Sequence, residues 1–171
     1  IGTHAIQLAY RLGARVLATA GTDAKCRRCE ELGAVKAINY KTQDFVTEAR
    51  RVGVVDVILD MVGGDYIQRG LELLAPGGRL VMLALKQGAR LELDCGLIQG
   101  KNLCLTGSRL RPRPIAEKGR LVSAVRKAVW PLIERGDFRP VVDSVYPLRA
   151  VQDAHRRMES GEHVGKVLLA I

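Results

Sequence analysis

Apolar positions along the chain repeat with two different periods in alternating stretches. Recurrence every three or four residues predicts helices at 1–12, 22–33, 42–51, 65–78, 114–134 and 149–161. Short apolar runs predict strands at 14–20, 36–39, 54–62, 79–85, 102–108, 140–148 and 165–171, and strict alternation at 89–94 predicts an exposed or edge strand. Glycines at 13 and 33 are suited to end the first two helices, and a short polar residue can cap the next two at Thr22 or Asp23 and at Thr42 or Asp44.

This alternation of strands and helices predicts an α/β fold with a doubly wound parallel sheet. Ligands of such sheets bind beyond the carboxyl ends of the strands. Position alone therefore selects the residues that follow the predicted strands, namely 20–22, Tyr40, 61–63, 84–86 and 108–111.

The length of 171 residues suits one domain with part of another, and an apolar content of 47% supports a real core. No apolar run approaches the roughly 20 residues that span a bilayer, so a membrane partner is not expected. The chain starts with Ile1 rather than Met. We expect it to be a piece of a longer polypeptide.

Four cysteines are too few for a disulfide scaffold at this length. Cys26 and Cys29 form a C-x-x-C pair, which redox or zinc chemistry could use. Both lie in a helical pattern, where positions three apart share a face, and no second Cys or His pair follows at zinc-ribbon spacing. We therefore favour helix packing, no metal site and a reducing, cytoplasmic location.

The net charge is +9, and nine basic residues between Arg109 and Arg139 face only three acids. Such a stretch can attract nucleic acid, but it lacks the interleaved aromatic residues that stack on bases. A solvated helix face with anion-binding residues is the favoured interpretation. An RNA-binding module remains an alternative.

The end of the second predicted strand carries no carboxylate for an adenosine ribose, although NAD-binding folds place one there. It carries Gly21 and Thr22, then Lys25 one turn into the next helix, and Tyr40 follows the third strand. Glycine permits close backbone approach, and the other three offer hydroxyl, ammonium and phenol donors. This set suits a dianion such as a ribose 2′-phosphate.

Seven blocks of the sequence resemble the cofactor-binding half of NADPH:quinone oxidoreductases, in the zinc-free branch of the medium-chain dehydrogenase/reductase superfamily. The blocks are IGTHAIQLA, GARVLATAGTDAKCRRCEELGA, AINYKTQDF, DVILDMVGG, LAPGGRLV, LTGSRLRPR and AHRRMESGEHVGKVLL. They run nearly from end to end in the usual order, and INYK and ESGEHVGKVLL are the most specific.

The resemblance implies a Rossmann-type domain at residues 1–140 and a segment at 141–171 that packs toward a GroES-like catalytic domain. That domain would precede this chain in the same polypeptide. Ile1 and Gly2 would be the last residues of the Gly-rich phosphate turn, so the first strand of the sheet would be absent here. Its two neighbours would then expose unpaired backbone groups.

The resemblance also implies which residues hold NADPH. Lys25 and Tyr40 would bind the 2′-phosphate beside Gly21 and Thr22. Ile1, Gly2 and the first helical turn would hold the pyrophosphate, which Lys166 would reach from the last strand. Gly63 would admit the adenosine, and Leu83, Leu110 and Arg111 would border the nicotinamide. We expect His155 to be a structural helix residue and assign no acid or base catalyst.

The implied activity is hydride transfer from NADPH to a quinone or another conjugated carbonyl compound. An enoyl or alkenal reductase would share this cofactor half, and a nucleotide- or RNA-binding module is the alternative outside enzymes. Members of the family are often dimers through an edge strand, here residues 102–108, so we expect a homodimer.

Overall fold

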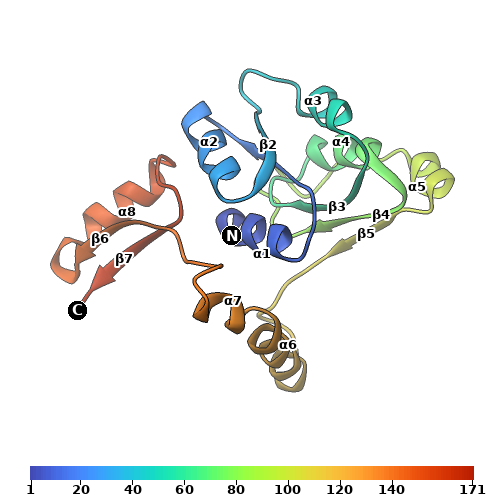
Figure 1. Ribbon diagram of the computed structural model, residues 1–171. Coiled ribbons are helices and arrows are strands. Elements are labelled where there is room, and N and C mark those ends of the chain that lie inside the picture. The colour runs from blue at the N-terminus through green and yellow to red at the C-terminus, as the bar shows by residue number, and fades with distance from the viewer. The chain divides into compact units, whose positions relative to one another are not determined.

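The computed structural model describes residues 1–171 and confirms an α/β fold in which every strand pair is parallel. The strands form three small sheets, with the orders β1-β2, β3-β4-β5 and β6-β7 (Figure 1). The contacts of the chain gather into two compact units, residues 1–41 with 120–171 and residues 42–119. The predicted division at residue 140 stays a prediction.

The first unit holds two of the sheets, β1-β2 and β6-β7. Its elements are α1 (Gly2–Arg11), β1 (Val16–Ala20), α2 (Asp23–Glu31), β2 (Ala34–Asn39), α7 (Trp130–Glu134), β6 (Val142–Pro147), the 3-10 helix η1 (Leu148–Ala150), α8 (Val151–Glu159) and β7 (Lys166–Ala170). In register, Ala20 at the end of β1 lies beside Asn39 at the end of β2. The carboxyl ends of these two strands therefore meet.

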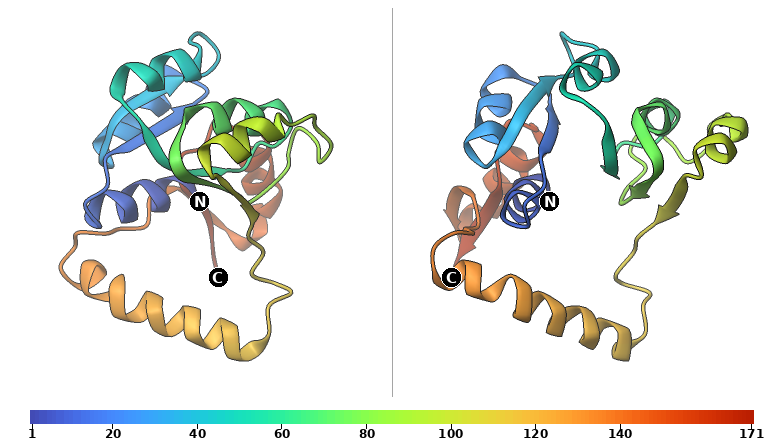
Figure 2. Two further views of the ribbon diagram at one scale, coloured as in Figure 1. Left: turned by 90° about the vertical axis from the view of Figure 1, so that its right-hand side faces the viewer. Right: turned by 45° about the vertical axis from the view of Figure 1, so that its right-hand side comes forward.

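The second unit is built on β3-β4-β5, on which α4 and α5 pack (Figure 2). Its elements are α3 (Phe45–Val52), β3 (Val55–Asp60), α4 (Asp65–Leu73), β4 (Leu74–Met82), α5 (Cys95–Lys101) and β5 (Cys104–Gly107). The helix α6 (Ile115–Ala128) begins in this unit and continues into the residues of the first.

Each unit buries its own apolar residues. In the second unit Ile67 and Leu71 of α4 meet Leu74 and Leu80 of β4, and all four are at most 1% exposed. In the first unit Ile38 of β2 is the most deeply buried apolar residue. Strand β3 differs, since Val57 and Leu59 are 56% and 48% exposed.

The strands β1 and β3 each pair along one edge only, with β2 and β4 respectively. A parallel sheet leaves unpaired backbone donors and acceptors along an open edge. These open edges on β1 and β3 are those predicted for the neighbours of an absent first strand.

Two predicted elements between residues 65 and 101 were wrong. The helix predicted over 65–78 ends at Leu73, because Leu74 already has extended backbone angles and leads into β4. Residues 89–94 form no strand, and the unpredicted helix α5 follows them. Asp94 caps that helix by accepting a hydrogen bond from the Leu97 amide at 3.2 Å, and Asn102 ends it in the left-handed conformation.

The long helix predicted over 114–134 was also wrong, because two helices, α6 and α7, occupy this range. The break follows from Pro131, whose ring nitrogen carries no hydrogen for a helical hydrogen bond. Pro131 lies in the first turn of α7, where a missing amide hydrogen costs nothing.

Candidate functional site

The carboxyl ends of β1 and β2 bring Gly21 and Tyr40 together, as their positions after neighbouring strands predict. The Tyr40 amide donates to the Ala20 carbonyl at 3.1 Å, which extends the strand pairing by one residue. A Cβ added to Gly21 would lie 2.7 Å from the Tyr40 hydroxyl, well inside contact distance. The phenol therefore occupies space that only glycine at position 21 leaves open.

Thr22 is the N-cap of α2, which decides between the two predicted caps. Its hydroxyl accepts a hydrogen bond from the Lys25 amide at 3.2 Å, and its carbonyl accepts from Cys26 at 2.9 Å. The cap places Lys25 in the first turn of the helix. The unpaired amides and positive dipole end of that turn favour an anion.

The Lys25 ammonium donates a hydrogen bond to the carbonyl of Gly161, in the turn between α8 and β7. This neutral partner leaves the positive charge of Lys25 uncompensated. Gly21 and Tyr40 lie together at the ends of β1 and β2, and Thr22 and Lys25 follow at the start of α2. We call these four residues the β1-β2 anion cradle.

Two charged residues that the sequence reasoning did not assign flank this cradle. The Asp23 carboxylate accepts a hydrogen bond from the Asn39 side-chain amide at 2.6 Å, and Asn39 is buried. The Lys41 side chain reaches to 3.5 Å from the position of a Cβ on Gly21. The nearby acid is therefore held by a fixed amide partner, and a second cation lies at the cradle.

The predicted pyrophosphate residues lie at the N-terminal end of α1. Ile1 is the N-cap, and its carbonyl accepts from the amides of His4 and Ala5 at 3.0 Å. No atom lies within 4 Å of a Cβ placed on Gly2, so the backbone there is open to approach. The first helical turn contains no acidic residue.

Lys166 acts electrostatically on this first turn. The pKa of His4 is lowered by burial first, then by the chain N-terminus and by the Lys166 ammonium. The His4 ring packs against Phe138 with centroids 5.4 Å apart. The Lys166 ammonium therefore lies close enough to act on His4, with a smaller effect than burial or the N-terminal ammonium.

Gly63, predicted to admit the adenosine, has a structural reason to be glycine. Its φ is +76°, and a Cβ there would lie 2.8 Å from the Gly88 carbonyl oxygen and 2.9 Å from Leu85 Cα. The buried Asp60 carboxylate at the end of β3 accepts from the Gly63 amide at 2.8 Å. This tight turn accounts for the glycine without any ligand.

A pocket of about 820 Å³ opens at the carboxyl ends of β4 and β5, which we call the β4-β5 pocket. It is lined by Met82, Leu83, Ala84, Leu85, Gly107, Ser108, Arg109, Pro112, Arg113, Pro114 and Glu117. Leu83 was predicted to border the nicotinamide and does line this pocket, whereas Leu110 and Arg111 lie outside its lining.

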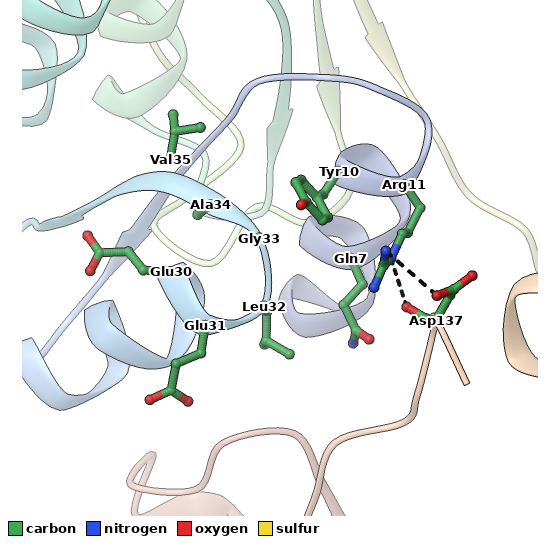
Figure 3. Close-up of a pocket in the computed structure, with 10 residues that line it drawn as sticks. All are labelled: Gln7, Tyr10, Arg11, Glu30, Glu31, Leu32, Gly33, Ala34, Val35 and Asp137. Carbon is green, nitrogen blue, oxygen red and sulfur yellow. Dashed lines mark hydrogen bonds and ion pairs between the residues drawn. The ribbon is translucent and has the colours of Figure 1, made fainter. Parts of the chain in front are cut away.

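A second pocket, of about 490 Å³, lies near the end of α1 and the start of β2 (Figure 3). None of the predicted site residues lines it. Its acids have partners: Asp137 pairs with Arg11, Glu31 pairs with Arg28, and Glu30 accepts from the Ala37 amide. We assign it no role in binding the cofactor.

The C-x-x-C pair of Cys26 and Cys29 lies in α2. All four cysteines are free, and burial is the main cause that raises the pKa of both Cys26 and Cys29. A raised pKa disfavours the thiolate, which is the nucleophile and metal ligand. No group of three or more His, Cys, Asp or Glu side chains is placed to hold a metal ion, and zinc independence stays a prediction. His155 is exposed on α8.

No helix is both long and apolar enough to cross a bilayer.

Comparison with known proteins matches residues 32–169 to the family described as zinc-binding dehydrogenase. The bovine protein named quinone oxidoreductase-like protein 2 is 30% identical over 166 residues, which cover 94% of this chain and 46% of that protein.

Two solved structures share the fold. The quinone oxidoreductase from Thermus thermophilus, also solved in complex with NADPH, is 32% identical with a TM-score of 0.86. An NAD-dependent alcohol dehydrogenase is equally identical, at 32%, with a TM-score of 0.77. Each alignment covers 99% of this chain. It covers 54% of the quinone oxidoreductase chain and 47% of the alcohol dehydrogenase chain, so this chain spans about half the length of each.

These matches confirm the predicted resemblance, while the two structures differ in the cofactor that their titles name. The chain belongs to the zinc-binding dehydrogenase family, and it is similar to the C-terminal half of quinone oxidoreductases of the medium-chain dehydrogenase/reductase superfamily.

Proposed function

We propose that this chain is the NADPH-binding portion of an oxidoreductase that transfers hydride to a quinone or another conjugated carbonyl compound. The observation that carries the proposal is the β1-β2 anion cradle, in which the Tyr40 hydroxyl lies beside Gly21 and Lys25, one turn into α2, has only a neutral carbonyl partner. The nearby Asp23 carboxylate is held by the Asn39 amide. A ribose 2′-phosphate has nearly two negative charges and three acceptor oxygens, so it can accept hydrogen bonds from both the ammonium and the phenol.

In this proposal each residue of the cradle has its own task. The Lys25 ammonium exchanges the Gly161 carbonyl for the phosphate, which is the stronger partner because the bond becomes charge-assisted. The Tyr40 hydroxyl donates over the surface of Gly21, and Thr22 holds the first turn of α2 in place. The Asn39 amide holds the Asp23 carboxylate by a hydrogen bond, which limits its repulsion of the phosphate.

The remaining predicted residues extend the site along the cofactor. The start of α1 at Ile1 and Gly2, with Lys166, suits the pyrophosphate, because helix N-termini bind phosphate through backbone amides. Gly63 would lie near the adenosine and Leu83, Leu110 and Arg111 near the nicotinamide. When bound, the nicotinamide supplies the hydride, and the protein supplies orientation and a cleft that excludes water. Groups that contact the substrate would come also from the other half of the polypeptide.

Two further parts of the proposal concern partners. The acceptor would be a small quinone or enone, for which the apolar β4-β5 pocket offers space. A homodimer would form through β5, which pairs with β4 along one edge only.

The minimal test uses two ligands that differ only in the 2′-phosphate. Calorimetric titration of the 171-residue chain with 2′,5′-ADP and with 5′-AMP should give at least about tenfold tighter binding of 2′,5′-ADP, since one charge-assisted hydrogen bond is worth about 1.5–3 kcal/mol. Equal affinity for both would overturn the NADPH assignment. Turnover of the polypeptide that carries this chain, with NADPH and either quinones or enones, then identifies the acceptor.

A further inference from the structure

Apolar and charged residues of the β4-β5 pocket come from two segments of the chain. Met82, Leu83, Ala84 and Leu85 lie at the end of β4 and just after it. The other lining residues lie at the end of β5 and after it, at 107–109, 112–114 and 117, with prolines at 112 and 114. This composition suits a small, largely apolar ligand, because small-molecule pockets are mostly apolar with a few placed polar groups.

The charged residues that line the pocket do not cancel one another. Arg113 pairs with Glu117 and also donates from Nε to the Arg109 carbonyl at 3.1 Å. These contacts fix the Arg113 guanidinium and neutralise it. Arg109 forms no ion pair with any acid, and its side chain is exposed within the lining. The pocket thus holds one neutral ion pair and one uncompensated cation.

We propose that this pocket selects acceptors that carry an anionic group on a planar apolar body, and that Arg109 is the residue that determines this specificity. The identity of the ligand as the hydride acceptor depends on the proposed function. The preference for an anion depends only on the pocket, so it can be measured without the cofactor.

The physical basis is a charge-assisted contact beside apolar surface. The guanidinium presents a planar fork that matches a carboxylate with two parallel hydrogen bonds. The preference is electrostatic and should therefore weaken with added salt.

The test compares 2-naphthoate with 2-naphthamide, which share one ring system and differ in charge. Amide chemical shifts of Ala84, Leu85 and Ser108 in the 15N-labelled chain report binding in the pocket. We expect 2-naphthoate to bind about tenfold more tightly at low salt. Arg109→Gln should abolish the difference, and Arg109→Lys, which keeps the charge but not the planar fork, should keep only part of it. Arg90→Gln, which removes an exposed charge of the same unit outside the lining, should leave it unchanged.

A second variant acts in the opposite direction. Glu117→Gln releases Arg113 from its ion pair, so the preference for 2-naphthoate should rise above that of the unmodified chain. The proposal is overturned by equal affinities of the unmodified chain, or by a preference that survives Arg109→Gln. It is also overturned if Arg109→Gln weakens NADPH binding while the naphthoate preference stays intact. Failure of the proposed function appears instead as equal binding of 2′,5′-ADP and 5′-AMP.

Discussion

The Tyr40 hydroxyl lies 2.7 Å from the position that a Cβ on residue 21 would occupy. Gly21 follows β1 and Tyr40 follows β2, so the parallel pairing of two strands creates this approach. A side chain at position 21 would push the phenol away from the cradle. The absence of a side chain at Gly21 therefore determines where the Tyr40 hydroxyl, a hydrogen-bond donor, can lie.

Gly21→Ala should weaken NADPH binding with little effect on stability. Tyr40 is 44% exposed, so its ring can move outward at small cost, and the free energy of unfolding should change by about 0.5 kcal/mol or less. The loss of one charge-assisted donor should raise the dissociation constant for NADPH about tenfold. Calorimetric titration checks the first effect and thermal unfolding the second. An unchanged NADPH affinity would show that Tyr40 does not bind the 2′-phosphate.

Asp23→Asn should improve NADPH binding. The variant keeps an oxygen that can accept from the Asn39 amide but removes the negative charge beside the cradle. A nearby like charge disfavours a phosphate, so the dissociation constant for NADPH should fall by about threefold to tenfold, an electrostatic change of about 1 kcal/mol. The affinity for NADH should stay constant. A parallel change for both cofactors would show that Asp23 does not act through the 2′-phosphate.

Asp143→Asn should lower the free energy of unfolding and should make that free energy less dependent on pH in the acid range. The Asp143 carboxylate is 10% exposed and accepts from Arg157 Nε and Nη2 and from the Val164 amide at 2.9–3.0 Å. The Arg157 hydrogen bonds are the main cause that holds the pKa of Asp143 well below its usual range. The stabilisation is present above the unfolded-state pKa of about 3.9 and is lost as the pH falls toward the folded pKa.

The variant should therefore unfold more easily by about 1–2 kcal/mol at pH 7, since charged hydrogen bonds are lost. It should also lose less stability than the unmodified chain between pH 5 and pH 2. Urea unfolding at several pH values measures both. Parallel acid dependence of the two chains would contradict this role of Asp143.

Leu80→Ala should strongly destabilise the second unit. Leu80 is fully buried against Ile67, Leu71 and Leu74, and truncation of such a leucine costs about 2–5 kcal/mol through lost burial and a cavity. Val122→Ala is the matched control, because Val122 is 67% exposed on α6 and should change stability by about 0.5 kcal/mol or less. Similar unfolding midpoints of the two variants would contradict the burial of Leu80 in the core of the second unit.

The sequence predicted the approach of Gly21 and Tyr40 because both residues follow neighbouring parallel strands. The place of Lys25 in the first turn of α2 follows from the N-cap before it. The Asn39–Asp23 contact was not predicted, because it depends on the register between β1 and β2 and on side-chain direction. The identity of Arg109 as the lining arginine, rather than Arg111, likewise depends on how the loop after β5 turns.

The helix α5 was missed for a different reason. Its sequence CGLIQGK contains two glycines and lacks a regular apolar stripe, so neither propensity nor periodicity predicts a helix. The alternation of the preceding residues instead resembles a strand. Two features stabilise the helix, the N-cap at Asp94 and the packing of α5 against α4 and β4. The packing is a tertiary interaction, whereas the cap is local.

The measurement that tests the central claim most directly is the ratio of the NADH and NADPH dissociation constants in the unmodified chain and in Lys25→Ala/Tyr40→Phe. Two charge-assisted hydrogen bonds to the 2′-phosphate predict that the double variant lowers this ratio by about two orders of magnitude or more while binding NADH as before. Equal weakening of both cofactors, or a ratio that the double variant leaves unchanged, would contradict the claim that these residues hold the phosphate.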